Sequence, residues 1–360
     1  MDKEGVDPAL MHTIAGPAAA ALECLSSAQI EFIQSLPKAE LHAHLNGSIP
    51  IEILQHLARD YLASDHNSVS GDEIKSAIQT LLHGPSLEEI HDFFTLFPAI
   101  YALTSTRSAL AYATRAVLAD FLDGERPQCA YLELRTTPRE MKEMTREEYL
   151  RAVLEEVERY PSERAALIVS LDRRMNAEIM GQCVDVAVKL RREGRRVVGV
   201  DLCGDPTAGD VNSFAEAFER ARSAGLRITL HIAETIHNSE AETLKLLSFK
   251  PTRLGHATFL NTDSKRIVHE HRICIEICLS SNLLCRTVSM LDEHHIRYYI
   301  HHGHPVAICT DDTLPFRTSL LGEYALLMAP APKGLGLTEE EVKIIAEMSM
   351  AARFSIQETN

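Results

Sequence analysis

The sequence predicts an α/β fold, a (β/α)8 TIM barrel with extra helices inserted after its first strand. Two observations support this prediction. Short apolar runs alternate with longer amphipathic segments along most of the 360 residues, a pattern typical of parallel strands joined by helices. Polar residues also follow the apolar runs at their carboxyl ends, which meet at one mouth in such a barrel.

The eight apolar runs are the candidate strands. They occupy residues 39–45, 129–135, 166–172, 197–202, 227–232, 252–256, 273–279 and 305–310. Helix-like segments follow at residues 145–158, 177–193, 211–224, 239–248 and 262–271. The stretch 46–128 is longer than an ordinary connection, so we expect it to fold as extra helices over the mouth. Its Phe93, Phe94 and Phe97 are expected in a lid or in the outer core.

A doubly wound sheet would share this alternation, but it would not gather eight strand ends at one point. It is also disfavoured because no Gly-x-Gly-x-x-Gly follows the first run. We expect a loosely ordered N-terminal leader over residues 1–25 and a single barrel domain over residues 26–360.

Composition restricts the partners. A formal net charge of -15 argues against nucleic acid, although a small anion can still enter a locally basic pocket. Eight scattered cysteines, several inside strand-like runs, indicate reduced thiols in a cytosolic protein. No apolar run approaches the roughly 20 residues that span a bilayer. We expect a cytosolic monomer without a membrane partner.

Four residues at predicted strand ends form a candidate metal site. His42 and His44 are two apart in a strand, so their side chains point to the same side. His231 and Asp311 follow two later runs. Three imidazoles and one carboxylate suit a catalytic zinc with one position left for water, and the pKa of that water falls to about 7.

Polar residues beside these ligands are candidates for proton transfer and substrate contact. Glu234 suits a proton shuttle, or it is an acid at a helix N-terminus. His256 and Asp312 suit the handling of the attacking water, and Asp312 alternatively caps a helix. Gly204 permits close approach of a ligand to the backbone, or it is a turn glycine.

The ordered motifs resemble those of the adenosine deaminase family within the amidohydrolase superfamily. They are LPKAELHAHLNGS (36–48), DLCGD (201–205), HIAE (231–234), RLGH (253–256), SSN (280–282) and CTDD (309–312), within a resemblance that covers residues 36–325. The resemblance implies one zinc ion per chain, held by His42, His44, His231 and Asp311. It also implies that Glu234 donates a proton to purine N1, while His256 and Asp312 handle the water that attacks C6. Expected substrate contacts at the strand ends are His44, Asp172, Gly204 and Asp312.

One departure from the family pattern points to the substrate. Adenosine deaminases usually carry aspartate after His-x-His-Leu, where this chain has Asn46. A carboxylate would repel a 5′-phosphate, whereas an amide is neutral and can donate a hydrogen bond to it. The hydroxyls of Thr104, Ser105 and Thr106, with the cation of Arg107, are then candidate phosphate contacts, or they cap a helix. This combination resembles a branch that acts on N6-substituted purine nucleoside monophosphates, converting N6-methyl-AMP to IMP and methylamine.

Other functions fit the residues less well. An adenosine deaminase acting on the free nucleoside is disfavoured by Asn46. AMP deaminases carry a large N-terminal extension that this chain does not show. A catalytically silent purine-binding barrel is disfavoured because every ligand and acid–base position is filled. A binuclear hydrolase would need a bridging lysine at the end of strand 4, where none is present.

Overall fold

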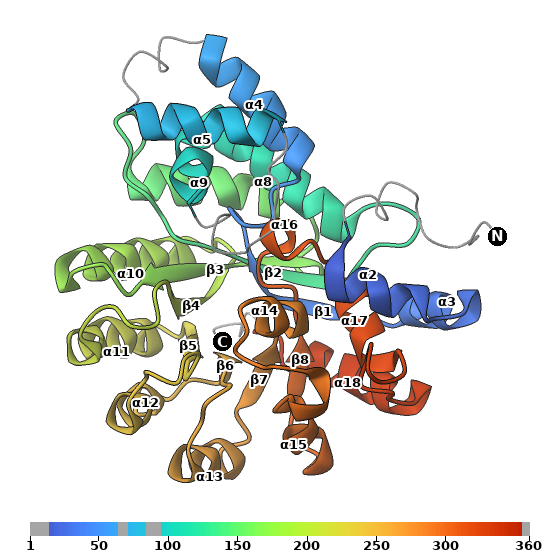
Figure 1. Ribbon diagram of the computed structural model, residues 1–360. Coiled ribbons are helices and arrows are strands. Elements are labelled where there is room, and N and C mark those ends of the chain that lie inside the picture. The colour runs from blue at the N-terminus through green and yellow to red at the C-terminus, as the bar shows by residue number, and fades with distance from the viewer. Residues whose placement is uncertain (1–13, 64–70, 84–94, 355–360) are drawn as a thin grey trace.

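The eight predicted strands form one parallel sheet in sequence order (Figure 1). The structure, a computed structural model, describes residues 14–63, 71–83 and 95–354. The strands are β1 Ala39–His44, β2 Tyr131–Thr136, β3 Ala165–Asp172, β4 Val197–Cys203, β5 Arg227–Ile232, β6 Arg253–His256, β7 Cys274–Ile277 and β8 Val306–Ile308. The last strand returns to the first through a bridge between Ala43 and Asp311. The predicted (β/α)8 barrel is therefore confirmed.

Helices surround this barrel. They are α2 Gly16–Glu23, α3 Ser27–Ser35, α4 Ile51–Ala63, α5 Asp72–His83, α7 Phe97–Leu103, α8 Arg107–Leu122, α9 Arg146–Val157, α10 Ala177–Arg192, α11 Ala215–Ser223, α12 Glu240–Leu247, α13 Thr262–Glu270, α14 Leu279–Leu284, α15 Ile296–His301, α16 Thr313–Phe316, α17 Leu320–Met328 and α18 Glu339–Ala351, with short 3-10 turns η2 Val211–Phe214 and η3 Leu291–Glu293. The five helices expected between later strands all appear within two residues of their predicted limits, except that the first turn of 211–224 is η2.

The long segment after β1 supplies the predicted extra helices. Helices α4, α5 and α7 pack against one another, and α8 lies beside α9 in the outer ring (Figure 1). Phe97 is half-buried against the hydrophobic core, whereas Phe93 and Phe94 lie outside the described residues. Part of α7 approaches the carboxyl ends of the strands, since the ring of Tyr101 lies 3.3 Å beneath the Arg139 guanidinium.

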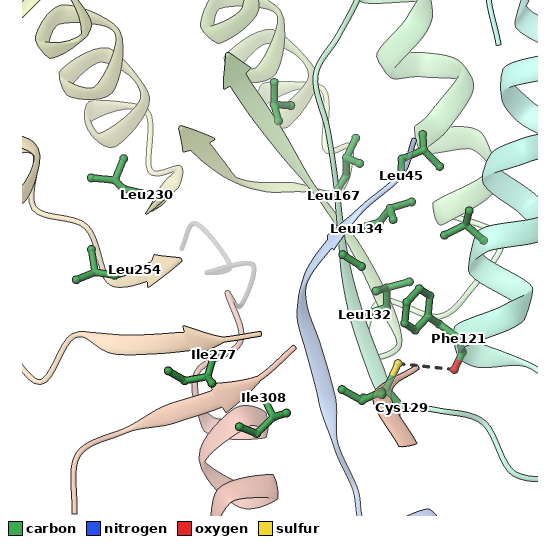
Figure 2. Packing of buried hydrophobic residues seen from close by; sticks show 14 of the residues in the cluster. Leu45, Phe121, Cys129, Leu132, Leu134, Leu167, Leu230, Leu254, Ile277 and Ile308 are labelled. Atoms are coloured by element: carbon green, nitrogen blue, oxygen red, sulfur yellow. Dashed lines mark hydrogen bonds between the residues drawn. The ribbon is translucent and has the colours of Figure 1, made fainter. Parts of the chain in front are cut away.

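Alternation along β2 shows how the sequence places charge inside the barrel. Leu132 and Leu134 belong to the hydrophobic layer between strands and helices (Figure 2). Glu133 and Arg135, between and after them, point inward and are fully buried. Because side chains alternate across a strand, a single run both packs the helices and supplies ionic groups to the interior.

The N-terminal segment differs from the expected leader. Residues 1–13 lie outside the described residues, but α2 packs against α17 with Ala18, Ala21 and Leu22 buried. Small residues permit this close packing, since a Cβ built on Gly322 would lie 2.9 Å from the Cβ of Ala18. Residues 16–23 are thus a packed helix, while the single domain over 26–360 stays a prediction.

All eight cysteines lie within the described residues, and none of them forms a disulfide. Six are buried, as their positions in apolar runs predicted. Among the described helices, none has the length and apolar character needed to cross a membrane.

Candidate active site

Three imidazoles converge at the carboxyl ends of β1 and β5. His42 and His44 project from the same side of β1, and His231 reaches them from β5. The Nε2 atom of His231 lies 3.0 Å from that of His42 and 3.2 Å from that of His44. The Oδ1 atom of Asp311 lies 3.7 Å and 3.5 Å from the same two histidine atoms. These four donor atoms all lie within 4.8 Å of one another.

Carboxylates bind the outer nitrogens of two of these rings. His42 Nδ1 donates to Glu276 at 2.6 Å, and His231 Nδ1 donates to Asp201 at 3.1 Å. Each Nε2 lone pair is therefore directed toward the shared centre, as metal-binding histidines require. Burial lowers the pKa of His42 well below its usual value and that of His44 to about 3, which keeps both in the neutral form that binds metal. For His231, burial is outweighed by the charge and hydrogen bond of Asp201, which raise its pKa to about 9, so a metal ion there would have to displace a proton. The donor set fits a metal ion.

An arginine joins the two orienting carboxylates. Arg135, fully buried at the end of β2, lies 2.9 Å from Glu276 and 3.4 Å from Asp201. Burial opposes ionisation of Glu276, but the charges of Arg135 and Arg253 hold its pKa well below the usual range. Arg253 in turn pairs with Glu133 and Glu276 at 2.6 Å each. This buried network of charged side chains therefore holds the rings of His42 and His231 in a fixed orientation.

Two adjacent aspartates both reach the site because β8 ends at Ile308, before them. Asp311 adopts a left-handed backbone, with φ 63°, so the chain turns between the two carboxylates. Burial and the charge of Asp311 raise the pKa of Asp312 well above its usual value, which suits a proton acceptor. Asp312 precedes α16 without a capping hydrogen bond, so the alternative role of helix cap is not supported. A Cβ on Gly47 would lie 1.7 Å from Asp312 Oδ1, so glycine is required there.

Glu234 and His256 lie close to each other, and His256 lies close to Asp311. Glu234 Oε1 is 3.8 Å from His256 Nε2, and Asp311 Oδ2 is 3.9 Å from the same nitrogen. Helix α12 begins at Glu240 with Ser239 as its cap. Glu234 is therefore not an acid of that helix, and its side chain, which is partly exposed, lies beside His256.

Gly204 lies beside Asp172 at the ends of β4 and β3. Its φ is 95°, and a Cβ there would lie 2.6 Å from Asp172 Oδ1. Both facts require glycine at this position. Burial raises the pKa of Asp172, but hydrogen bonds from Arg174 outweigh it and lower the pKa overall, so this carboxylate is ionised and can accept hydrogen bonds from a ligand.

Donors without acceptors gather around Asn46. The hydroxyl of Tyr149 donates to Asn46 Oδ1 at 3.5 Å, while Asn46 Nδ2 is buried and has no partner among the described residues. Arg139 Nε is likewise buried without a partner there. Its charge acts on both Tyr149 and Asp172. This corner of the mouth is therefore suited to an acceptor-rich, anionic group.

The predicted phosphate contacts at 104–107 are engaged elsewhere. The hydroxyls of Thr104 and Ser105 donate to backbone carbonyls of α7, at 2.9 and 2.7 Å. Thr106 caps α8 by accepting from Ala109 N, and the half-exposed Arg107 pairs with Glu155 at 2.5 Å. The helix-capping alternative thus describes Thr106, and phosphate contact by these four residues stays a prediction.

Sequence reasoning missed the orienting role of Asp201 and Glu276. A lone glutamate inside the apolar run ICIEICL was a signal for Glu276, because an unpaired charge is rarely buried.

Comparisons with known proteins agree with this geometry. The family model described as "Adenosine deaminase" matches residues 37–359. N6-Methyl-AMP deaminase of Mus musculus is 37% identical over 82% of this chain and 82% of its own length. The crystal structure of an Arabidopsis N6-mAMP deaminase has a TM-score of 0.79 and 34% identity, and the match covers 91% of this chain and 96% of that one. An Arabidopsis relative complexed with IMP has a TM-score of 0.78 and 34% identity, with coverage of 90% and 94%.

Proposed function

We propose that this chain, which belongs to the adenosine deaminase family, is a metal-dependent hydrolase that converts N6-methyl-AMP and water to IMP and methylamine. The observation that carries the proposal is the convergence of His42, His44, His231 and Asp311 beside a set of acid–base side chains. The names of the mouse and Arabidopsis relatives, and the IMP bound to one of them, support a nucleotide substrate.

The metal proposed for this site is zinc, one ion per chain. Imidazole nitrogen and carboxylate oxygen are donors that zinc accepts, and four protein donors leave room for water in an expanded coordination. When bound, zinc supplies a nucleophilic hydroxide at neutral pH and a positive charge that stabilises the transition state.

The chain's own residues would move the protons. Glu234 would donate to purine N1, which makes C6 more electrophilic. His256 and Asp312 would take and hold the proton of the attacking water, and the buried Asp312, with its raised pKa, is suited to that task. The water oxygen bonds to C6 and the bond from C6 to N6 breaks. One of the two water protons goes to the nitrogen of the departing amine, and the other restores the acid form of Glu234, so that N1 of the product keeps the proton it received. Asp172 and the backbone at Gly204 would contact the purine side of the ligand.

Asn46 and Arg139 would bind the 5′-phosphate. Both hold buried donors that lack an acceptor among the described residues, and Tyr149 donates to Asn46 and is acted on by the charge of Arg139. A phosphate offers only acceptor oxygens and carries negative charge, so it satisfies both donors. The stacking of Arg139 on Tyr101 keeps the guanidinium in place before the ligand arrives.

The enzyme would work in the cytosol, in line with its unpaired thiols.

Product formation from N6-methyl-AMP, AMP, N6-methyladenosine and adenosine, measured side by side at neutral pH, tests this function. We expect conversion of N6-methyl-AMP to IMP with a kcat/KM at least about 100-fold above that for either nucleoside, because the nucleosides leave two buried donors unpaired. Preference for adenosine would overturn the nucleotide assignment and leave a nucleoside deaminase.

Asn46→Asp is expected to shift preference from the nucleotide toward the nucleoside. A carboxylate at this place would face the phosphate, and such like-charge contact costs several kcal/mol. We expect kcat/KM for N6-methyl-AMP to fall at least about 30-fold, with a smaller change for N6-methyladenosine. Asn176→Asp, which adds the same charge at the exposed cap of α10, serves as the control. A mutant that keeps a strong preference for the monophosphate would refute the role of Asn46.

A further inference from the structure

A second cavity lies at the opposite end of the barrel from the candidate active site. It has a volume of about 430 Å³ and lies between the amino ends of β5, β6 and β7 and the end of α18. Its wall includes Arg227, Arg253, Arg272 and Arg353, and no aspartate or glutamate among the described residues lines it. Arg227 precedes His231 by four residues of strand, which is about 13 Å along β5. The cavity is therefore separate from the metal ligands.

Three of these four arginines have no carboxylate partner in the part of the chain that the structure describes. Arg253 is neutralised by Glu133 and Glu276. Arg272 donates to Gly303 O at 3.2 Å, and Arg353 donates to Met350 O at 2.7 Å. Within the described part of the chain, no carboxylate oxygen lies within the 4.0 Å ion-pair distance of Arg227, Arg272 or Arg353. About three positive charges thus line the cavity without compensation.

A group of arginines without carboxylate partners is unusual in a chain with an excess of acidic residues. The protein has 36 basic and 51 acidic residues, and other arginines, such as Arg151, Arg195 and Arg222, each have a glutamate within ion-pair distance. Close to the cavity, burial and then the charge of Arg227 lower the pKa of Arg191, so even a neighbouring arginine experiences the excess positive charge. Like charges held together cost free energy unless an anion joins them.

We propose that this cavity binds a phosphate-bearing small molecule at a site distinct from the catalytic mouth. Guanidinium groups bind phosphate oxygens in pairs, and three unpaired cations favour an anion with more than one negative charge over a single carboxylate. The volume falls within the range of small-molecule sites, about 300–1,000 Å³. Met348, Ala351 and Phe354 supply an apolar wall for the rest of the ligand. The inference does not depend on the identity of the substrate.

Calorimetric titration of the full, metal-loaded chain with inorganic phosphate tests the site. The titration is made in parallel on Arg139→Gln, which removes the cation proposed to bind phosphate at the catalytic mouth, so that binding at the two places can be told apart. We expect one phosphate to bind per chain with a Kd of about 1 mM or below, and we expect Arg227→Gln combined with Arg353→Gln to weaken that binding at least tenfold.

Arg220→Gln combined with Arg222→Gln is the matched control. It removes the same charge from the surface, where both arginines already pair with acids, and we expect it to leave phosphate binding within twofold of the original. Absence of binding to the unmodified chain would overturn the proposal. Equal weakening in both double variants would overturn it as well, because it would show a general charge effect. If Arg139→Gln abolishes all phosphate binding, the anion occupies the catalytic mouth and the second site does not exist.

Discussion

Replacing Glu234 with glutamine is expected to lower kcat by about 10²–10⁴-fold, the usual contribution of a positioned general acid. An amide keeps the shape of the side chain but cannot transfer a proton to purine N1. Glu234 lies outside the set of four metal donors and 3.8 Å from His256. The variant should therefore bind the metal as the original does and lose only turnover.

The measurement combines steady-state kinetics with metal content for each purified protein. Glu240→Gln is the matched control, because Glu240 is an exposed acid in the first turn of the neighbouring helix α12 and is expected to keep full activity. Equal metal content with activity within tenfold of the original would refute the proton-donor role of Glu234. Lost metal in Glu234→Gln would instead assign this carboxylate to the metal shell.

Most of the barrel could be predicted because its signals are local. A strand such as 227–232 is an apolar run followed by polar residues, and the structure gives β5 the same limits. The four metal donors were also predictable, since strand ends of one barrel meet at one mouth. The lengths of β7 and β8 were overestimated, because helix α14 begins at Leu279 and β8 ends at Ile308. Helix starts and turns near a site depend on packing that a local pattern does not contain.

Residues that act through distant partners could not be predicted. Glu276 reaches His42 across 234 positions of sequence, and only the closure of the barrel brings them together. Arg107 and Arg139 look alike in the sequence, yet one pairs with Glu155 at the surface and the other stacks on Tyr101. Tertiary packing decides between these outcomes. The N-terminal helix α2 was missed for the same reason, because its alanines gain stability only when they pack against α17.

Arg135→Met is expected to destabilise the fold by about 3–5 kcal/mol, the usual cost of leaving buried charges without their partner. Arg135 is fully buried between Glu276 and Asp201, and each of these carboxylates also binds a histidine of the metal site. Without the guanidinium, the two carboxylates would bind protons more readily and orient the imidazoles less firmly. We therefore expect the variant to lose metal affinity together with stability.

Urea unfolding of the metal-loaded protein measures the loss of stability, and titration with a competing chelator measures the loss of metal affinity. The control is Arg151→Met, which removes an arginine that pairs with Glu147 and Glu193 at a partly exposed position and should cost no more than about 1 kcal/mol.

Arg135→Lys keeps a positive charge but cannot contact both carboxylates at once, so its loss of stability should lie between those of the two methionine variants. If Arg135→Met unfolds at the same urea concentration as the control and keeps its metal, the buried network does not support the site. If stability falls but metal affinity does not, the network holds the barrel together without orienting the histidines.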